Sequence, residues 1–218
     1  EKHTFPGGIH PAGSKELSKQ ELIREYLPQG NLVYPLAQHI GAPAKPVVKK
    51  GDHVLAGQMI AEAGGFVSAP IYASVSGTIL GISKHLTLTG AVVDAIELEN
   101  DHAYEEVEWP EPTDPTTLSK EEILERIATA GVIGMGGAGF PTRVKLSPKE
   151  PDKIEYILVN GAECEPYLTS DYRLLLERPQ ELINGLKIVL QLFPQAKGYI
   201  CIEDNKMDCV EKIEQMVK

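Results

Sequence analysis

The sequence predicts a β domain followed by an α/β domain, and three observations support this prediction. Residues 31–102 alternate short β-branched runs with glycine turns, which is typical of a sandwich or barrel of short strands. Residues 103–118 hold three prolines and four glutamates and form a predicted acidic linker. Residues 119–218 alternate apolar runs with helical stripes, which favours a parallel sheet. Residues 1–30 precede the first strand and form a predicted amino-terminal extension.

The elements of the second half follow from their local patterns. A Ser-x-x-Glu capping box predicts a helix start, a proline suits a first helical turn, and apolar β-rich runs predict buried strands. The predicted elements are a helix from Ser119 to about Thr129, buried strands within 154–161 and 196–203, a helix from Pro179, and an amphipathic helix over 206–217. Two strands are too few for a finished sheet, so we expect the α/β domain to be incomplete.

Composition excludes several classes of function. The formal net charge is 21 − 31 = −10, which argues against a nucleic-acid partner. No apolar run approaches the ~20 residues of a membrane span, so we predict no transmembrane segment. The spacing of Cys164, Cys201 and Cys209 matches no zinc or iron–sulfur site, and we expect reduced thiols that bind no metal. All six histidines precede residue 131, which disfavours a hydrolase built on a histidine base beyond it.

The most distinctive stretch is GVIGMGGAGFPTRVKL, residues 131–146, which contains a G-x-G-x-x-G pattern at residues 134–139. A standard dinucleotide fingerprint follows a strand and opens a helix, whereas here a predicted helix precedes the pattern and Pro141 follows it. Two interpretations remain open. The loop can present free N–H groups to an anionic or flat ligand, with Arg143 and Lys145 near a phosphate, or it can simply allow close helix–strand packing.

A second polar cluster, NGAECEPYLTSDYR, follows the predicted strand within 154–161 and contains Asn160, Glu163, Glu165 and Asp171. Ligands of open α/β sheets bind beyond the carboxyl ends of strands. Grouped carboxylates repel unless they accept hydrogen bonds, and ligand hydroxyls would supply donors. The alternative is a solvated loop in which Asp171 caps a short helix at 172–177.

Together, GMGGAGFPTRVK and NGAECEP resemble the flavin site of the NADH-oxidising subunit of respiratory complex I. The resemblance implies that this chain binds flavin mononucleotide (FMN) and NAD(H). The resemblance assigns one group of residues to the flavin or its phosphate: Gly134, Gly136, Gly137, Ala138, Gly139 and Lys145. It assigns a second group to the flavin ribityl chain or the nicotinamide nucleotide: Asn160, Glu163 and Glu165. Two positions depart from that family, because Met135 replaces an arginine and Ala162 replaces an aspartate.

The first half resembles the C subunit of the Rnf electron-transport complex, through TFPGGIHP (4–11) and the segments 35–62 and 64–79. This implies a subunit of an ion-translocating ferredoxin:NAD oxidoreductase, driving a sodium or proton gradient. The implied partners are other Rnf subunits and NADH, and the implied location is cytoplasmic, peripheral on the inner face of the bacterial membrane. The family's 4Fe-4S clusters are expected only in downstream sequence, beyond residue 218.

Residues 48–79 also resemble a biotinyl or lipoyl carrier domain, which predicts a barrel-sandwich fold. A carrier presents a lysine at a hairpin tip, here near Ala63–Phe66, and no lysine occurs there. The domain is therefore predicted to be a docking scaffold rather than a swinging arm. His39 and His53 are expected to form structural hydrogen bonds rather than to bind metal.

The predicted architecture is thus an N-terminal barrel-sandwich β domain followed by an incomplete Rossmann-like α/β flavin-binding domain. The predicted function is electron transfer within an Rnf-type oxidoreductase, the fragment alone being inactive. Three alternatives stay open. The chain could be a non-catalytic scaffold like the A subunit of the sodium-pumping quinone reductase. It could be a soluble Rnf-like electron-transfer protein serving a cytoplasmic reductase such as proline reductase. Finally, the fragment could bind nothing by itself.

Overall fold

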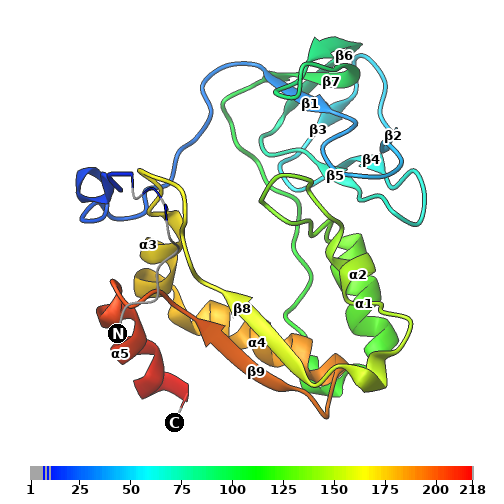
Figure 1. The fold of residues 1–218 in the computed structure, drawn as a ribbon. Helices are drawn as coiled ribbons and strands as arrows, with labels where there is room; N and C mark the ends of the chain where they lie inside the picture. The colour runs from blue at the N-terminus through cyan, green and yellow to red at the C-terminus, as the bar shows by residue number, and fades with distance from the viewer. Residues whose placement is uncertain (1–6, 8, 10, 218) are drawn as a thin grey trace. The chain divides into compact units, whose positions relative to one another are not determined.

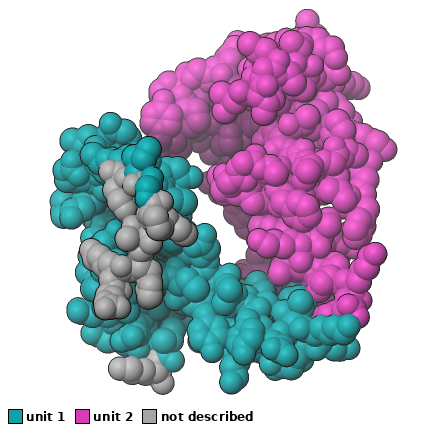
Figure 2. Space-filling model, in the orientation of Figure 1, with its two compact units in different colours: residues 1–25, 152–218 teal, residues 26–151 magenta. Residues whose placement is uncertain are grey.

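The structure is a computed structural model that describes residues 7, 9 and 11–217. The chain divides into two compact units (Figure 1). Figure 2 colours residues 26–151 magenta and the described residues among 1–25 and 152–218 teal. We call residues 26–151 the β unit and residues 1–25 with 152–218 the α/β unit. Most of the TFPGGIHP motif lies outside the described residues.

Two antiparallel sheets form the centre of the β unit. The larger has the strand order β1-β7-β6-β3 and the smaller the order β2-β4-β5. The strands are β1 (Leu32–Pro35), β2 (Lys45–Pro46), β3 (His53–Val54), β4 (Met59–Glu62), β5 (Ile71–Tyr72), β6 (Gly77–Leu86) and β7 (Val92–Asn100). The prediction of a β domain with short strands and glycine turns is confirmed.

The core of the β unit draws apolar side chains from both sheets. Val54, Ile60, Ile96 and Leu98 are completely buried, and Ile79 is nearly so. Full burial of side chains of this size stabilises a fold by about 1.5–3 kcal/mol each. Strands of two to ten residues can therefore hold together because their inward faces share one core.

Both histidines singled out in the sequence form hydrogen bonds, as predicted. His39 is buried, and its Nε2 accepts a hydrogen bond from the Ala69 N–H at 3.1 Å. His53 Nε2 lies 3.0 Å from a carboxylate oxygen of Asp101. Hydrogen bonds from Ser76 and Ala103, and then from His53, lower the pKa of Asp101 to about 2.

The predicted linker packs on the β unit. Glu106 forms a parallel bridge with Ala56, and a Cβ built on Gly57 would come within 2.7 Å of the Trp109 ring. After η2 (Pro115–Thr117), α1 (Lys120–Thr129) begins at a capping box formed by Ser119 and Glu122, as predicted. The short helix α2 (Thr142–Lys145) follows. Residues 103–151 thus group with the β unit, whereas the sequence predicted a boundary after residue 118.

Among its described residues, the α/β unit contains a two-stranded parallel sheet and three α-helices. Its elements are η1 (Lys15–Leu17), β8 (Tyr156–Asn160), α3 (Ser170–Glu177), α4 (Pro179–Leu192), β9 (Lys197–Cys201) and α5 (Met207–Val217), and β8 pairs with β9 in register from Tyr156–Lys197 to Asn160–Cys201. Leu175, Cys209 and Ile213 form a small buried cluster. The order of strands and helices is the predicted one, and Pro179 occupies the first turn of α4.

The prediction that both strands of this unit are buried is wrong. Leu158 is 66% exposed, and Tyr156 and Tyr199 are about half exposed. The helix α4 contacts both strands, but these three side chains stay open to solvent. The apolar runs therefore predicted the positions of the strands correctly. Whether the side chains of a strand are buried depends on what covers each face of its sheet. In residues 7, 9 and 11–217, no helix combines the length and apolar character needed to cross a membrane.

Candidate functional site

The glycine loop, residues 134–139, is closed at its base by backbone pairing. Ile133 forms an antiparallel bridge with Pro141, the Gly134 N–H donates to Phe140 O at 2.9 Å, and the Thr142 N–H donates to Val132 O at 3.0 Å. The loop lies between α1 and α2 in the β unit. This pairing fixes both ends of the loop and leaves its tip to be set by other contacts.

One side of the loop rests on the segment of the β unit that contains His39. The Ile40 N–H donates to Ala138 O at 2.9 Å. Gly139 is buried with φ +56°, and a Cβ there would lie 2.7 Å from Gln38 O. Glycine is therefore required at residue 139 for two reasons, the left-handed backbone and the close approach of another chain segment.

The other side of the loop is open. A Cβ built on Gly136 or Gly137 would meet no atom within 4 Å, and residues 134–138 are exposed. Within the part of the chain that the structure describes, the amides of Gly136 and Gly137 have no hydrogen-bond partner. Unpaired amides around glycines form a concavity suited to a phosphate or a flat ring. These amides suit the phosphate or the ring acceptors of a flavin nucleotide in their hydrogen-bonding chemistry.

The two cations that follow the loop differ in their contacts. Arg143 lies 3.7 Å from the Glu125 carboxylate and 5.8 Å from the centre of the Phe66 ring. Lys145 is exposed at the end of α2, and the described residues offer it no ion-pair partner. Lys145 therefore remains the candidate cation for a phosphate, whereas Arg143 is held by the protein.

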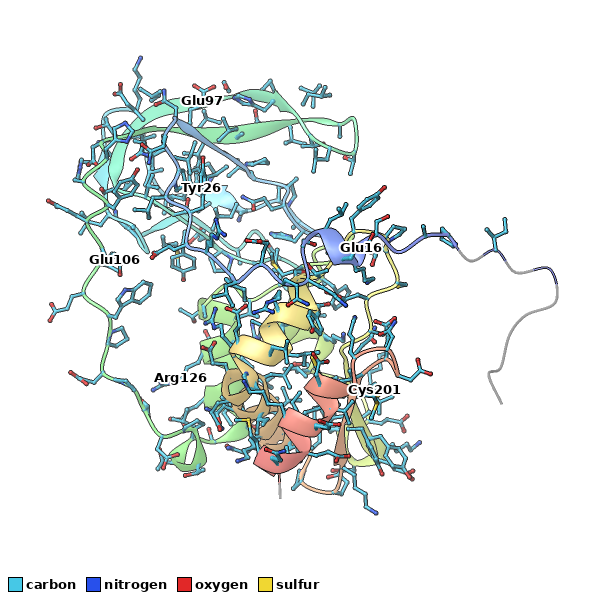
Figure 3. The ribbon with its side chains drawn as sticks, turned by 90° about the vertical axis from the view of Figure 1, so that its left-hand side faces the viewer. Glu16, Tyr26, Glu97, Glu106, Arg126 and Cys201 are labelled. Atoms are coloured by element: carbon cyan, nitrogen blue, oxygen red, sulfur yellow. The ribbon has the colours of Figure 1, made fainter. Side chains whose placement is uncertain are left out.

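Asn160 and Glu165 are accessible members of the second predicted cluster, and Asp171 is exposed as well. Asn160 is the last residue of β8, and its side-chain oxygen accepts the Ala162 N–H at 3.2 Å. Glu165 is exposed. Both follow the carboxyl end of a parallel strand, where ligands of α/β sheets bind. Cys164 is also exposed in this segment, and Cys201 ends β9, where Figure 3 labels it.

Glu163, in contrast, is buried in an ion cluster. Its side chain is 2% exposed, and one carboxylate oxygen lies 2.9 Å from Lys206 Nζ, whose side chain is 5% exposed. Lys206 also bonds the Glu203 carboxylate, which in turn accepts the Glu163 N–H at 3.0 Å. Sequence reasoning missed Glu203 and Lys206. The available signal was their position after β9, whose carboxyl end lies beside that of β8.

The same carboxylate caps α3. Glu163 accepts the N–H groups of Asp171 at 2.7 Å and Tyr172 at 3.2 Å. The alternative interpretation included a helix at 172–177 capped by Asp171. The helix is present, but it begins at Ser170 and Asp171 lies inside its first turn, so Asp171 is not its cap. A carboxylate from another segment satisfies the free amides and interacts favourably with the positive end of the helix.

The charges of this cluster stabilise one another. Burial opposes ionisation of Glu163, but hydrogen bonds from Lys206 and the Tyr172 and Asp171 amides lower its pKa overall. Burial likewise opposes the charge on Lys206, and the carboxylates of Glu203 and Glu163 raise its pKa overall. All three groups are thus charged at neutral pH. A cavity of about 440 Å³ adjoins the cluster and is lined in part by Lys15, Lys19, Thr169 and Tyr172.

The predicted site residues fall into two groups. Gly134, Gly136, Gly137, Ala138, Gly139 and Lys145 belong to the β unit, and Asn160, Glu163 and Glu165 belong to the α/β unit. Within each group the structure brings the residues into one local segment. Their common role toward a nucleotide stays a prediction.

Comparison with known families assigns the two halves of the chain. Residues 3–103 match the family model of the RnfC barrel sandwich hybrid domain. Residues 127–218 match that of the Nuo51 FMN-binding domain. The predicted order of a barrel-sandwich domain and a flavin-binding α/β domain is thereby confirmed.

Curated relatives carry the same two halves. The chain is 42% identical over 214 residues to the C subunit of the proton-translocating ferredoxin:NAD(+) oxidoreductase complex of Clostridium ljungdahlii, covering 97% of this chain and 47% of the relative. It is 36% identical over 225 residues to the C subunit of the Na(+)-translocating ferredoxin:NAD(+) oxidoreductase complex of Acetobacterium woodii, covering 99% and 49%. It is 38% identical over 217 residues to the C subunit of an ion-translocating oxidoreductase complex of Haemophilus influenzae, covering 98% and 33%. The chain spans about half the length of the first two relatives, and by these matches it belongs to the RnfC family.

Proposed function

We propose that this chain holds FMN and NAD(H) in the C subunit of an ion-translocating ferredoxin:NAD oxidoreductase. The observation that carries the proposal is the open face of the glycine loop, where the amides of Gly136 and Gly137 are free of partners among the described residues. The match of residues 127–218 to an FMN-binding domain supports it, as do relatives named for ferredoxin:NAD(+) oxidoreductase complexes.

In this proposal the protein contributes position and electrostatics. Bound FMN supplies the chemistry, since a flavin exchanges two electrons with a nicotinamide and single electrons with iron–sulfur clusters. The loop amides bind an anionic or ring group, and Lys145 neutralises a phosphate. Asn160 and Glu165 accept hydrogen bonds from ligand hydroxyls. Glu163 holds the segment between them in place through its own bonds to α3 and Lys206.

The proposal extends to partners and location. We expect the protein to contact other subunits of an Rnf-type complex at the cytoplasmic face of the bacterial membrane, since the relatives named above are complex subunits. The iron–sulfur clusters that receive electrons are expected in sequence beyond residue 218. The coupling ion stays open, because one relative is named for protons and the other for sodium.

The test is reconstitution of the full-length protein with FMN in the absence of oxygen, followed by addition of NADH. Bleaching of the flavin absorbance within the mixing time of the experiment is the expected result. A protein that binds FMN without bleaching would retain the flavin site and lose the NAD(H) part of the proposal. A protein that binds no FMN would overturn the proposal.

Glu165 allows a sharper test than Glu163, because its side chain is exposed. We expect Glu165→Gln to raise the dissociation constant of FMN or of NADH about tenfold, because glutamine still accepts a hydrogen bond but no longer as a charged acceptor. Glu211→Gln, an exposed change of the same kind on α5, is the matched control and should alter neither constant. If Glu165→Gln and Glu211→Gln gave the same dissociation constants for FMN and NADH, Glu165 would not belong to the site.

A scaffold without a flavin is the second candidate, and two observations favour it. Met135 is 97% exposed at the loop position where the complex I family has an arginine, and the Glu163 carboxylate is fully engaged by the protein. On this reading the open loop would contact another protein of the complex. Absence of FMN binding, together with retained assembly into the complex, would select the scaffold.

A further inference from the structure

The amino-terminal segment 13–23, here called the strap, lies on the α/β unit although the whole β unit follows it in the chain. It contains η1, marked by the Glu16 label in Figure 3, and in Figure 1 it runs beside the yellow loop that precedes α3. The strap contacts are the Tyr167 N–H to Gly13 O at 2.7 Å, Ser18 Oγ to Thr169 Oγ1 at 2.9 Å, Arg173 Nη1 to Lys19 O at 3.1 Å, and the Ile23 N–H to the Glu177 carboxylate at 3.1 Å.

Lys15 joins the two ends of the 163–168 loop. Its Nζ donates to Glu163 O at 2.7 Å and to Leu168 O at 3.0 Å. Both bonds reach backbone carbonyls, so they fix the path of the loop rather than one side chain. Glu165 lies between these two anchors.

The strap also holds an unusual backbone conformation in this loop. Tyr167 has φ +68°, a left-handed value that residues with a Cβ adopt at an energetic cost. Its N–H is the donor to Gly13 O. A left-handed conformation of this kind persists only when contacts with the surrounding structure stabilise it. Here the hydrogen bond to Gly13 O in the strap is such a contact.

Charge balance gives Lys15 a second role. Two carboxylates, Glu163 and Glu203, face one ammonium group, Lys206, so that cluster alone carries one excess negative charge. Lys15 Nζ lies 3.6 Å from the Glu163 carboxylate and brings the sum to zero. Buried charges are tolerated when they are paired, and the strap supplies the missing cation.

We propose that the strap is a structural part of the nucleotide site and that Lys15 is a positioning residue for the loop carrying Glu163 and Glu165. This inference rests on the proposed function, because that loop matters to a ligand only if the ligand binds there. The strap would then help to build the part of the site that the α/β unit contributes.

The test uses the full-length protein with Lys15→Met and, as a matched control, Lys19→Met. Lys19 belongs to the same strap, and its substitution removes the same charge, but its side chain is exposed and only its backbone oxygen bonds α3. We expect Lys15→Met to raise the FMN dissociation constant about tenfold, as expected for lost charged hydrogen bonds. We also expect faster hydrogen exchange in peptides covering residues 163–172. Lys15→Arg, which keeps the charge and the donors, should restore both.

The outcomes separate the inference from the proposed function. Wild-type affinity for FMN in Lys15→Met would overturn the inference and leave the proposed function standing. Unchanged exchange in residues 163–172, or equal effects of Lys15→Met and Lys19→Met, would overturn it as well. A wild-type protein that binds no FMN would overturn the proposed function, and the inference with it.

Discussion

Single residues decide how the glycine loop meets the β unit, and Gly139 is the clearest case. Its φ of +56° and the 2.7 Å approach of Gln38 O to the position of a Cβ both require glycine. Gly136, three residues earlier, has open space on its Cβ side. The two glycines of one motif thus serve different purposes, one for packing and one for access.

We therefore expect Gly139→Ala to lower the free energy of unfolding of the β unit by at least about 1–2 kcal/mol, the cost of a left-handed alanine. Gly136→Ala is the control and should leave stability nearly unchanged. The measurement is urea unfolding followed by the fluorescence of Trp109, the single tryptophan, which belongs to the β unit. Equal stability of both variants would mean that the loop does not rest on residues 38–40 as described.

The residue types of the second cluster were predictable, but their partners were not. Glu163 follows a strand and is a carboxylate, and both facts are visible in the sequence. Its carboxylate accepts a hydrogen bond from Lys206, 43 residues away, and its backbone oxygen accepts one from Lys15, 148 residues away. Both bonds depend on the folded chain. Sequence reasoning therefore assigned Glu163 the same role as the exposed Glu165, whereas the structure separates them by burial.

At the scale of elements, α3 depends on a cap from outside the helix, and this makes its stability sensitive to acid. The pKa of Glu163 is lowered from its usual 4.5 in the folded protein. Between pH 4.5 and the lower pKa of the folded state, the unfolded chain therefore binds more protons than the folded protein does. The stabilisation by Glu163 is present above pH 4.5 and is lost as the pH falls through the lower pKa of the folded state.

We expect Glu163→Gln to be less stable than the wild type at pH 7, with the difference shrinking as the pH falls through the lowered pKa of the wild-type carboxylate. Glutamine can still accept the amides of α3, but it lacks the charge that pairs with Lys206. The measurement is urea unfolding between about pH 3 and pH 7, followed by far-UV circular dichroism. Glu211→Gln, an exposed change on α5, should show no such convergence. A difference that is constant with pH would contradict the ionised cap.

Local patterns predicted the helices better than the strands. The capping box at Ser119 and the proline at the start of α4 act within one turn, so they identify helix starts directly. Apolar runs identified β8 and β9 but not their exposure. Burial of a strand is a property of the layers on both faces of its sheet, and no pattern within the strand contains that information.

In the molecule as a whole, each unit has a buried apolar cluster of its own. The buried apolar cluster of the β unit lies entirely within residues 26–151, and the cluster of Leu175, Cys209 and Ile213 lies entirely within the α/β unit. Contacts therefore divide the chain after residues 25 and 151 rather than at the predicted linker. The packing of Trp109 beside Gly57 shows why the linker groups with the β unit.

We accordingly expect residues 26–151, produced alone, to fold with the far-UV circular dichroism of a β protein and a single cooperative urea transition in Trp109 fluorescence. The same fragment with Ile96→Asp is the control, because a charge at a completely buried position should unfold it. A fragment without a cooperative transition would show that its core is insufficient without the rest of the chain.

Local sequence patterns were enough to predict the order of a β and an α/β half, the starts of α1 and α4, the glycine loop and the polar cluster after β8. These follow from interactions between residues close in the chain, such as capping, periodicity and turn geometry. Three features became visible only in the folded chain: Glu163 is buried and caps α3, Gly139 packs on residues 38–40, and the strap joins the α/β unit. The physical reason is common to all three: each depends on a contact between distant segments, and local patterns encode the residue but not its partner.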